Sequence, residues 1–259
     1  MLITRNGSAT GCAARRSIAS SITGGGSEGA PTSLSLPTDR PRPAVQTYRE
    51  RSLALHLPAD LSAAVNALAK REGLTPFMVL LAALQFVLAR FSGKAGCGRW
   101  NLGCGPPACS SGRTDRVFVN MLPARGPFGR SDGARLSGAT KETALGAYAH
   151  QDLPFEKLVA ELQPARDLSR QPIVQSLFVL QNTPRESGLN LAGLKLTAEG
   201  SNKATSTKSV SLYGTSTSKF DVSLYLTPGD DGFEGFWEYA TDLFDASSIE
   251  DISRNYVES

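Results

Sequence analysis

The chain has 259 residues, with 27 Lys and Arg against 24 Asp and Glu, and a formal net charge of +3. This length allows one large domain or two of ordinary size. The small charge argues against nucleic-acid binding, which concentrates Lys and Arg on one face. Four Cys are too few for a disulfide scaffold, and the 25 Gly have no collagen-like period.

The most apolar stretch runs from Pro76 to Ala89 and is interrupted by Gln85. It falls short of the roughly 18 apolar residues that a membrane span needs. Arg15 and Arg16 precede a polar, Gly-rich segment that lacks the apolar centre of a secretory signal. We therefore expect a cytoplasmic protein that binds neither membrane nor nucleic acid.

Hydrophobic periodicity and turn residues predict an α/β chain after an N-terminal segment, residues 1–28, whose Ser/Gly/Ala-rich composition is typical of disorder. The predicted elements in chain order are a strand over 53–57, helices over 60–72 and 77–91, a strand over 117–124, helices over 142–148 and 155–162, strands over 173–180 and 189–198, a hairpin of 220–226 with 233–240, and a helix over 246–256 that Asp245 caps.

Two windows have neither a helical nor a strand period. Residues 93–116 contain six Gly, two Pro and three of the four Cys, and residues 126–141 are similarly irregular. We expect no regular element in either window.

Candidates for catalysis or metal binding are few. The two histidines, His56 and His150, are far apart, and His56 lies in an amphipathic strand, where a surface or edge-strand role is expected. No G-x-S-x-G motif for a hydrolase nucleophile occurs. Cys97, Cys104 and Cys109 have a spacing that fits no zinc module, so we predict no metal site.

The strongest polar constellation runs from His150 to Glu156 and forms a turn into a helix. Asp152 precedes the helix and Glu156 lies in its first turn, where negative charge is stabilising. A capped turn accounts for these residue types. General acid–base catalysis is the alternative, and it requires a partner group and a pocket. Residues 166–172 are similarly predicted to form a charged loop before a strand.

Six segments together resemble the condensation domain of non-ribosomal peptide synthetases. Three follow family signatures: FVNMLPAR (118–125) resembles F-V-N-T-L-x-x-R, AYAHQDLPFEKLV (147–159) resembles H-Q-D-x-P-F-E, and RDLSRQP (166–172) resembles R-D-x-S-R-N-P with Gln171 in place of Asn. The other three are LPTDRPRP (36–43), SKFDVSLYL (218–226) and EYATDLFDASSIE (238–250).

The resemblance implies that residues 29–259 form the C-terminal lobe of a two-lobed α/β fold similar to chloramphenicol acetyltransferase. The family joins aminoacyl or peptidyl thioesters into an amide. Carrier proteins deliver both substrates on phosphopantetheine arms, so carrier proteins or neighbouring synthetase domains are the expected partners, with no bound cofactor. The residues that carry the motifs, in structural or lobe-interface roles, are Asn120, His150, Gln151, Asp152, Pro154, Phe155, Glu156, Arg166, Asp167, Ser169, Arg170 and Pro172.

The catalytic signature of the family, H-H-x-x-x-D-G, is not found in the sequence, which has no His-His pair. We therefore expect a remnant that is inactive alone. Two alternatives stay open: a half-enzyme complemented by a separate histidine-bearing lobe, or a non-catalytic module that binds a carrier protein. Because a one-base shift permits family-like residues in windows 93–116 and 126–141, we also hypothesise local frameshifts there, which the coding DNA would test.

Overall fold

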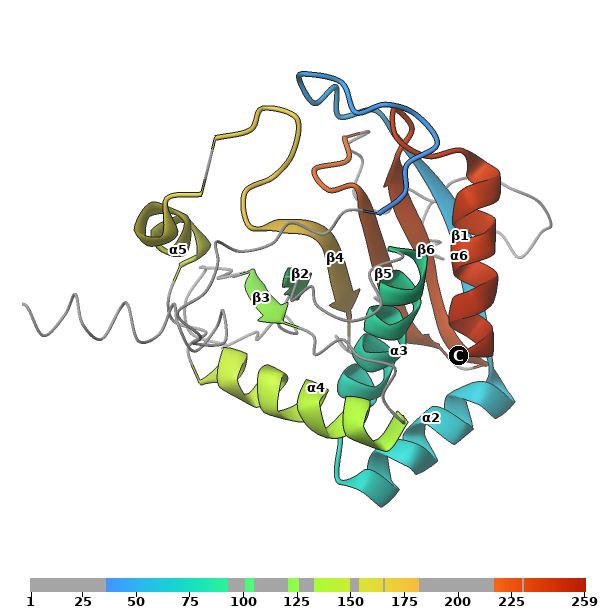
Figure 1. Ribbon diagram of the computed structural model, residues 1–259. Coiled ribbons are helices and arrows are strands. Elements are labelled where there is room, and N and C mark those ends of the chain that lie inside the picture. Colours follow the sequence, from blue (N-terminus) through green and yellow to red (C-terminus); the bar gives the residue numbers. More distant parts are fainter. Residues whose placement is uncertain are drawn as a thin grey trace, which may run out of the picture.

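The computed structural model describes residues 36–92, 101–104, 121–125, 133–149, 154–164, 166–181, 217–229 and 231–259. In these ranges six strands form one sheet, with helices on its faces and ends (Figure 1). The strands are β1 (Glu50–Pro58), β2 (Asn101–Cys104), β3 (Leu122–Arg125), β4 (Val174–Leu180), β5 (Val222–Gly229) and β6 (Gly232–Ala240), and the helices are α2 (Ala59–Glu72), α3 (Pro76–Phe91), α4 (Gly133–Tyr148), α5 (Phe155–Leu162) and α6 (Ala246–Glu258).

The sheet is mixed, with the strand order β1-β6-β5-β4-β2-β3. Strands β1, β6 and β5 are antiparallel neighbours, whereas β4 runs parallel to both β5 and β2, and β3 is antiparallel to β2. The predicted hairpin is confirmed as β5 and β6. Gly232 at its turn has φ +121°, and a Cβ there would lie 2.1 Å from the Leu57 carbonyl oxygen, so the turn requires glycine.

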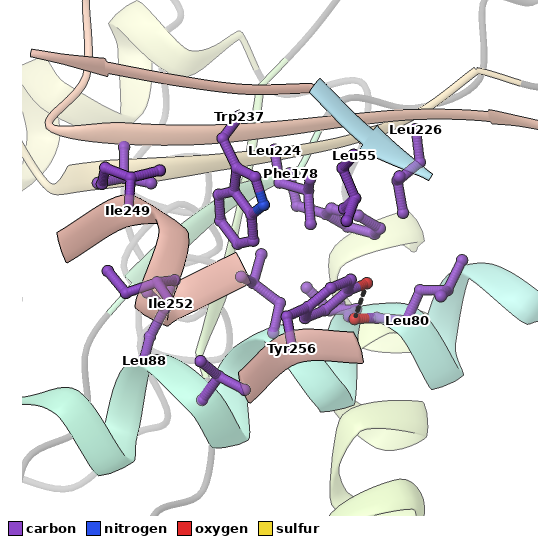
Figure 2. Close-up of a cluster of buried hydrophobic side chains, with 14 of the residues drawn as sticks. Leu55, Leu80, Leu88, Phe178, Leu224, Leu226, Trp237, Ile249, Ile252 and Tyr256 are labelled. Atoms are coloured by element: carbon purple, nitrogen blue, oxygen red, sulfur yellow. Dashed lines mark hydrogen bonds between the residues drawn. The ribbon is translucent and has the colours of Figure 1, made fainter. Parts of the chain in front are cut away.

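The main core lies between one face of the sheet and helices α3 and α6 (Figure 2). Alternate strand residues point to this face, as the two-residue period of a strand requires. The Tyr256 hydroxyl of α6 donates a hydrogen bond of 3.2 Å to the Leu80 carbonyl oxygen of α3, which joins the two helices. The large side chains buried in this core include Leu57, Phe178, Leu224, Leu226, Trp237, Tyr239, Leu81, Leu84, Leu88 and Ile249.

A second, smaller cluster seats α5 against the start of β4. Its buried members are Leu158 of α5, Ile173 and Val174 at the start of β4, and Phe220 just before β5. Phe155, the first residue of α5, packs against the same cluster. The predicted helix over 155–162 is therefore confirmed, and its apolar stripe faces the sheet.

Two elements begin where the sequence indicated no regular structure. Helix α4 starts at Gly133, inside the window 126–141, and β2 lies inside the window 93–116. Tertiary contacts override the weak local pattern: Thr140 of α4 is fully buried and donates a hydrogen bond of 3.2 Å to Gln85 of α3. Strand β2 is held through backbone pairing with β4 and β3, which needs no particular side chains.

Other predictions meet the structure in part. The strand expected over 117–124 is β3, whose observed start is Leu122, and residues 117–120 lie outside the described residues. The N-terminal segment 1–28 and the strand expected over 189–198 also lie outside them. In the described ranges no single helix could cross a membrane; only α2 and α3 together have the length and composition, and they are bent by 106°.

Candidate functional site

Four of the motif segments meet at one end of the sheet, where β4 and β5 begin and β6 ends. Residues 36–49, which we call the strap, lie across this end (blue in Figure 1). The strap is fixed by backbone hydrogen bonds from Asp39 N to Leu243 O (2.9 Å) and from Gln46 N to Leu168 O (3.0 Å). A third bond joins Thr241 N to Arg49 O (3.1 Å).

Arg42 is the central side chain of this arrangement. Its two terminal nitrogens donate to the two carboxylate oxygens of Asp221, at 2.9 Å and 2.5 Å, and one of them also donates to the Ser169 carbonyl oxygen at 3.1 Å. The side chains are 19% and 6% exposed for Arg42 and Asp221. Burial acts to lower the pKa of Arg42, but the hydrogen bond and charge of Asp221 outweigh it and raise that pKa.

The loop 166–172 is held by its own polar groups. Asp167 accepts hydrogen bonds from the Ser169 amide (2.8 Å) and hydroxyl (2.5 Å), and the Arg170 Nε lies 2.8 Å from its second oxygen. The hydroxyl and then the amide of Ser169 lower the pKa of Asp167, with a smaller contribution from Arg170. This loop therefore presents a fixed carboxylate at the surface, as the predicted self-bonded turn requires.

The start of α5 holds the remaining described motif residues. The Pro154 carbonyl oxygen accepts hydrogen bonds from the amides of Lys157 (3.0 Å) and Leu158 (3.2 Å), which begins the helix. Phe155 is the anchor in the second cluster, whereas Glu156 is exposed in the first turn. Arg166 is exposed on the loop, and the Pro172 carbonyl oxygen accepts a hydrogen bond of 2.7 Å from the Val174 amide.

The predicted cap of α6 is wrong in detail. Asp245 occupies the N-cap position but makes no capping hydrogen bond, because its carboxylate pairs with Arg40 of the strap. Asp39 takes over the function: its carboxylate accepts hydrogen bonds from the Asp245 amide (2.7 Å) and the Ser248 hydroxyl (2.8 Å). The strap therefore caps helix α6. Asp39 and Asp245, which this hydrogen bond joins, are 206 residues apart in the sequence.

The described part of this arrangement is suited to positioning the chain segments. The charged groups of Arg42, Asp221, Asp167 and Arg170 each face an opposite charge. His56 is exposed on the edge strand β1, as predicted. Within the described ranges no group of three or more His, Cys, Asp or Glu side chains could hold a metal ion. Asn120, His150, Gln151 and Asp152 lie outside the described residues.

Arg42 and Asp221 were not singled out from the sequence, although the segments that contain them were recognised. Arg42 stands between Pro41 and Pro43, and Asp221 is the one charged residue at the start of an apolar strand. A charge in such a place needs a partner when it is buried, which is the signal that could have singled out Asp221.

Comparison with known proteins gives a consistent family. A family model described as "Condensation domain" matches residues 27–259. A linear gramicidin synthase protein of Brevibacillus parabrevis is 39% identical over 239 residues, which cover 88% of this chain and 3% of that protein. Phosphinothricin tripeptide synthetase PhsB of Streptomyces viridochromogenes is 33% identical over 235 residues, which cover 88% of this chain and 18% of the synthetase. The chain therefore spans a small part of these relatives.

Solved structures share the fold. The X-domain from teicoplanin biosynthesis aligns with a TM-score of 0.77 at 24% identity, and the alignment covers 98% of this chain and 54% of the X-domain chain. The condensation domain of the monacolin K polyketide synthase MokA aligns with a TM-score of 0.70 at 16% identity, covering 96% of this chain and 56% of that domain. The expected chloramphenicol acetyltransferase-like α/β fold is confirmed, and the chain belongs to the condensation domain family.

Proposed function

We propose that these residues form the C-terminal lobe of a condensation domain, over 29–259, and that this lobe alone forms no amide bond. The reaction of the family joins aminoacyl or peptidyl thioesters on the phosphopantetheine arms of carrier proteins. In that reaction the lobe would act as a wall and a scaffold. The proton acceptor would come from a histidine-bearing lobe.

The observation that carries the proposal is the state of the motif residues themselves. Arg42, Asp221, Asp167 and Arg170 are engaged in ion pairs, so each supports the fold at the end of the sheet. A general base must reach the proton that it removes. His56 is exposed on an edge strand outside the motif cluster, and the sequence contains no His-His pair.

Complementation by a separate lobe is the alternative to an inert remnant. About half of each matched structure, the X-domain and the MokA domain, has no counterpart in this chain. A separate lobe of that size could supply the histidine motif and the second wall of a substrate tunnel between the two lobes. This candidate predicts activity only in the presence of both lobes.

A coupling assay tests the proposal. The purified chain is incubated with two carrier proteins, one loaded with a donor and one with an acceptor aminoacyl group, and the carriers are analysed by intact-protein mass spectrometry. We expect no dipeptidyl carrier with this chain alone. Product from a mixture with the histidine-bearing lobe of a relative supports complementation, and product from this chain alone refutes the proposal. The absence of product in both mixtures supports the remnant.

A non-catalytic binding module is the second candidate. It is favoured by a solved complex of the X-domain with a second protein, OxyB, in which the X-domain aligns with this chain at a TM-score of 0.75. If this chain acts in the same way, it binds a loaded carrier or a neighbouring synthetase domain with no turnover. Surface plasmon resonance with an immobilised loaded carrier distinguishes this candidate from an inert fragment, which gives no saturable signal.

A further inference from the structure

A surface pocket of about 470 Å³ lies beside the strap, where β1 begins, β6 ends and α6 starts. It is separate from the Arg42–Asp221 pair, and nothing in the proposed function uses it. The charged and polar residues of its wall that bear on its chemistry are Arg40, Arg49, Glu50, Arg51, Tyr239 and Asp245.

Three guanidinium groups line this pocket, and only one of them is neutralised by a nearby carboxylate. Arg40 pairs with Asp245 and donates to the Thr241 carbonyl oxygen at 2.5 Å. Arg49 and Arg51 are exposed, and in the part of the chain that the structure describes no carboxylate lies within salt-bridge distance of either. Arg49 and Arg51 are therefore the two guanidinium groups of the pocket that hold no carboxylate in a described ion pair.

Glu50, which lies between Arg49 and Arg51 in the sequence, forms no ion pair with either of them. Glu50 lines the pocket as well, but successive side chains of a strand point to opposite faces, so its side chain points away from those of Arg49 and Arg51. Its charge acts instead on Glu238, which is paired across β1 and β6 with Ser52 on the other face of the sheet. The negative charges of Glu250 and Asp245 also act on the Tyr239 hydroxyl and raise its pKa.

One further group favours an anion. The Tyr239 side chain is only 2% exposed, and Arg51 lies within hydrogen-bond reach of its hydroxyl group. A tyrosine hydroxyl is protonated at neutral pH, and burial raises the pKa of Tyr239 further, so this hydroxyl can donate a hydrogen bond. The start of α6 is not one of the anion-binding groups, because the Asp39 carboxylate already accepts hydrogen bonds there from the Asp245 amide and the Ser248 hydroxyl.

We propose that this pocket binds the phosphate group of a small ligand, with Arg49 and Arg51 as the principal donors. The planar fork of a guanidinium matches two oxygens of a phosphate, and two adjacent forks favour a dianion over a single carboxylate. The inference does not depend on the family reaction.

Isothermal titration of the full chain with inorganic phosphate, at constant ionic strength, tests the site. We expect saturable binding that the double variant Arg49→Gln/Arg51→Gln weakens roughly tenfold or more, as expected from the loss of charge-assisted hydrogen bonds. The control is Arg71→Gln/Arg254→Gln, which removes two exposed arginines outside the pocket (73% and 65% exposed) and should bind phosphate like the parent chain.

The outcomes decide the proposal. Equal phosphate affinity in the parent chain and the Arg49/Arg51 variant refutes it, and so does an equal loss in the control variant, which would indicate unspecific charge. Acetate that binds as tightly as phosphate refutes the preference for a dianion. Far-UV circular dichroism verifies folding, and if the double variant unfolds, the single variant Arg49→Gln must still lower the phosphate affinity by about threefold or more.

Discussion

Arg42 and Asp221 lie 179 residues apart in sequence and form a two-pronged ion pair at the end of the sheet. Arg42 belongs to the strap and Asp221 precedes β5, so the pair ties the first described segment of the chain to the central hairpin. The same guanidinium holds the loop 166–172 through the Ser169 carbonyl oxygen. Motifs that are separate in the sequence thus form one structural unit.

Breaking this pair should destabilise the chain strongly. Arg42→Met leaves the Asp221 carboxylate, which is 6% exposed, without its partner. We expect the free energy of unfolding to fall by about 3 kcal/mol, the lower end of the range for a buried pair, because Arg42 retains some exposure. Urea denaturation followed by circular dichroism measures this loss. The exposed pair of Arg71 with Glu72 is the control, and Arg71→Gln should change stability by less than about 0.5 kcal/mol.

The two aspartates at the start of α6 should have unequal effects. Asp39→Ala removes the acceptor of the Asp245 amide and of the Ser248 hydroxyl, and should cost about 1 kcal/mol. Asp245→Ala removes only an exposed ion pair with Arg40 and should cost less. Hydrogen exchange of the α6 first-turn amides, measured for both variants, checks the order. A larger effect of Asp245→Ala would show that the cap is local after all.

The hydrogen bond between α6 and α3 can be tested with a single oxygen atom. Tyr256→Phe removes the hydroxyl that donates to the Leu80 carbonyl oxygen and leaves the edge-to-face contact of the ring with Trp237, at 5.7 Å between centroids. We expect a loss of about 1 kcal/mol in the free energy of unfolding. Tyr48→Phe, at a side chain 45% exposed, is the matched control and should be neutral. Equal stability of Tyr256→Phe and the parent chain would contradict the buried bond.

Stability should depend on pH through Glu238. Burial, and then the charge of Glu50, raise the pKa of Glu238 to about 7, while Lys219 opposes the shift. The folded state therefore holds a proton that the unfolded state releases near the ordinary Glu value of 4.5. This contribution is complete below that value and is lost as the pH rises through about 7.

Glu238→Gln should remove this dependence and stabilise the chain at pH 8 by about 1–2 kcal/mol, since solvent screens a half-buried group. Thermal unfolding of both proteins between pH 5 and pH 8 measures the difference. Glu258→Gln, at an exposed position in the last turn of α6, serves as the control. If the parent and Glu238→Gln curves run parallel over this range, Glu238 does not titrate there.

Local patterns were sufficient for the hairpin and for the helices over 60–72, 77–91 and 155–162. In those segments the signals act over a few residues. The Thr75 side chain accepts a hydrogen bond of 3.3 Å from the Met78 amide at the start of α3, and Gly73 ends α2 in the left-handed conformation. The fold class and family followed from the motifs. The hairpin, these helices and the motifs depend on residues that are close together in the sequence, so one sequence is enough to predict them.

The partners of the strap could not be predicted, because they depend on contacts across most of the chain. Asp245 has the residue type of a cap, yet Arg40 draws its carboxylate away and Asp39 replaces it. The early start of α4 and the strand β2 likewise depend on α3 and β4. The sequence shows which residues are charged or polar, but the partner of each one is decided by the fold.

The most direct test of the central claim is the amount of dipeptidyl carrier formed by this chain alone. With both loaded carriers present and the chain at a concentration at which it is folded, we predict a rate no higher than that of the carriers without the chain. Amide formation that exceeds this background and rises in proportion to the concentration of the chain would contradict the claim.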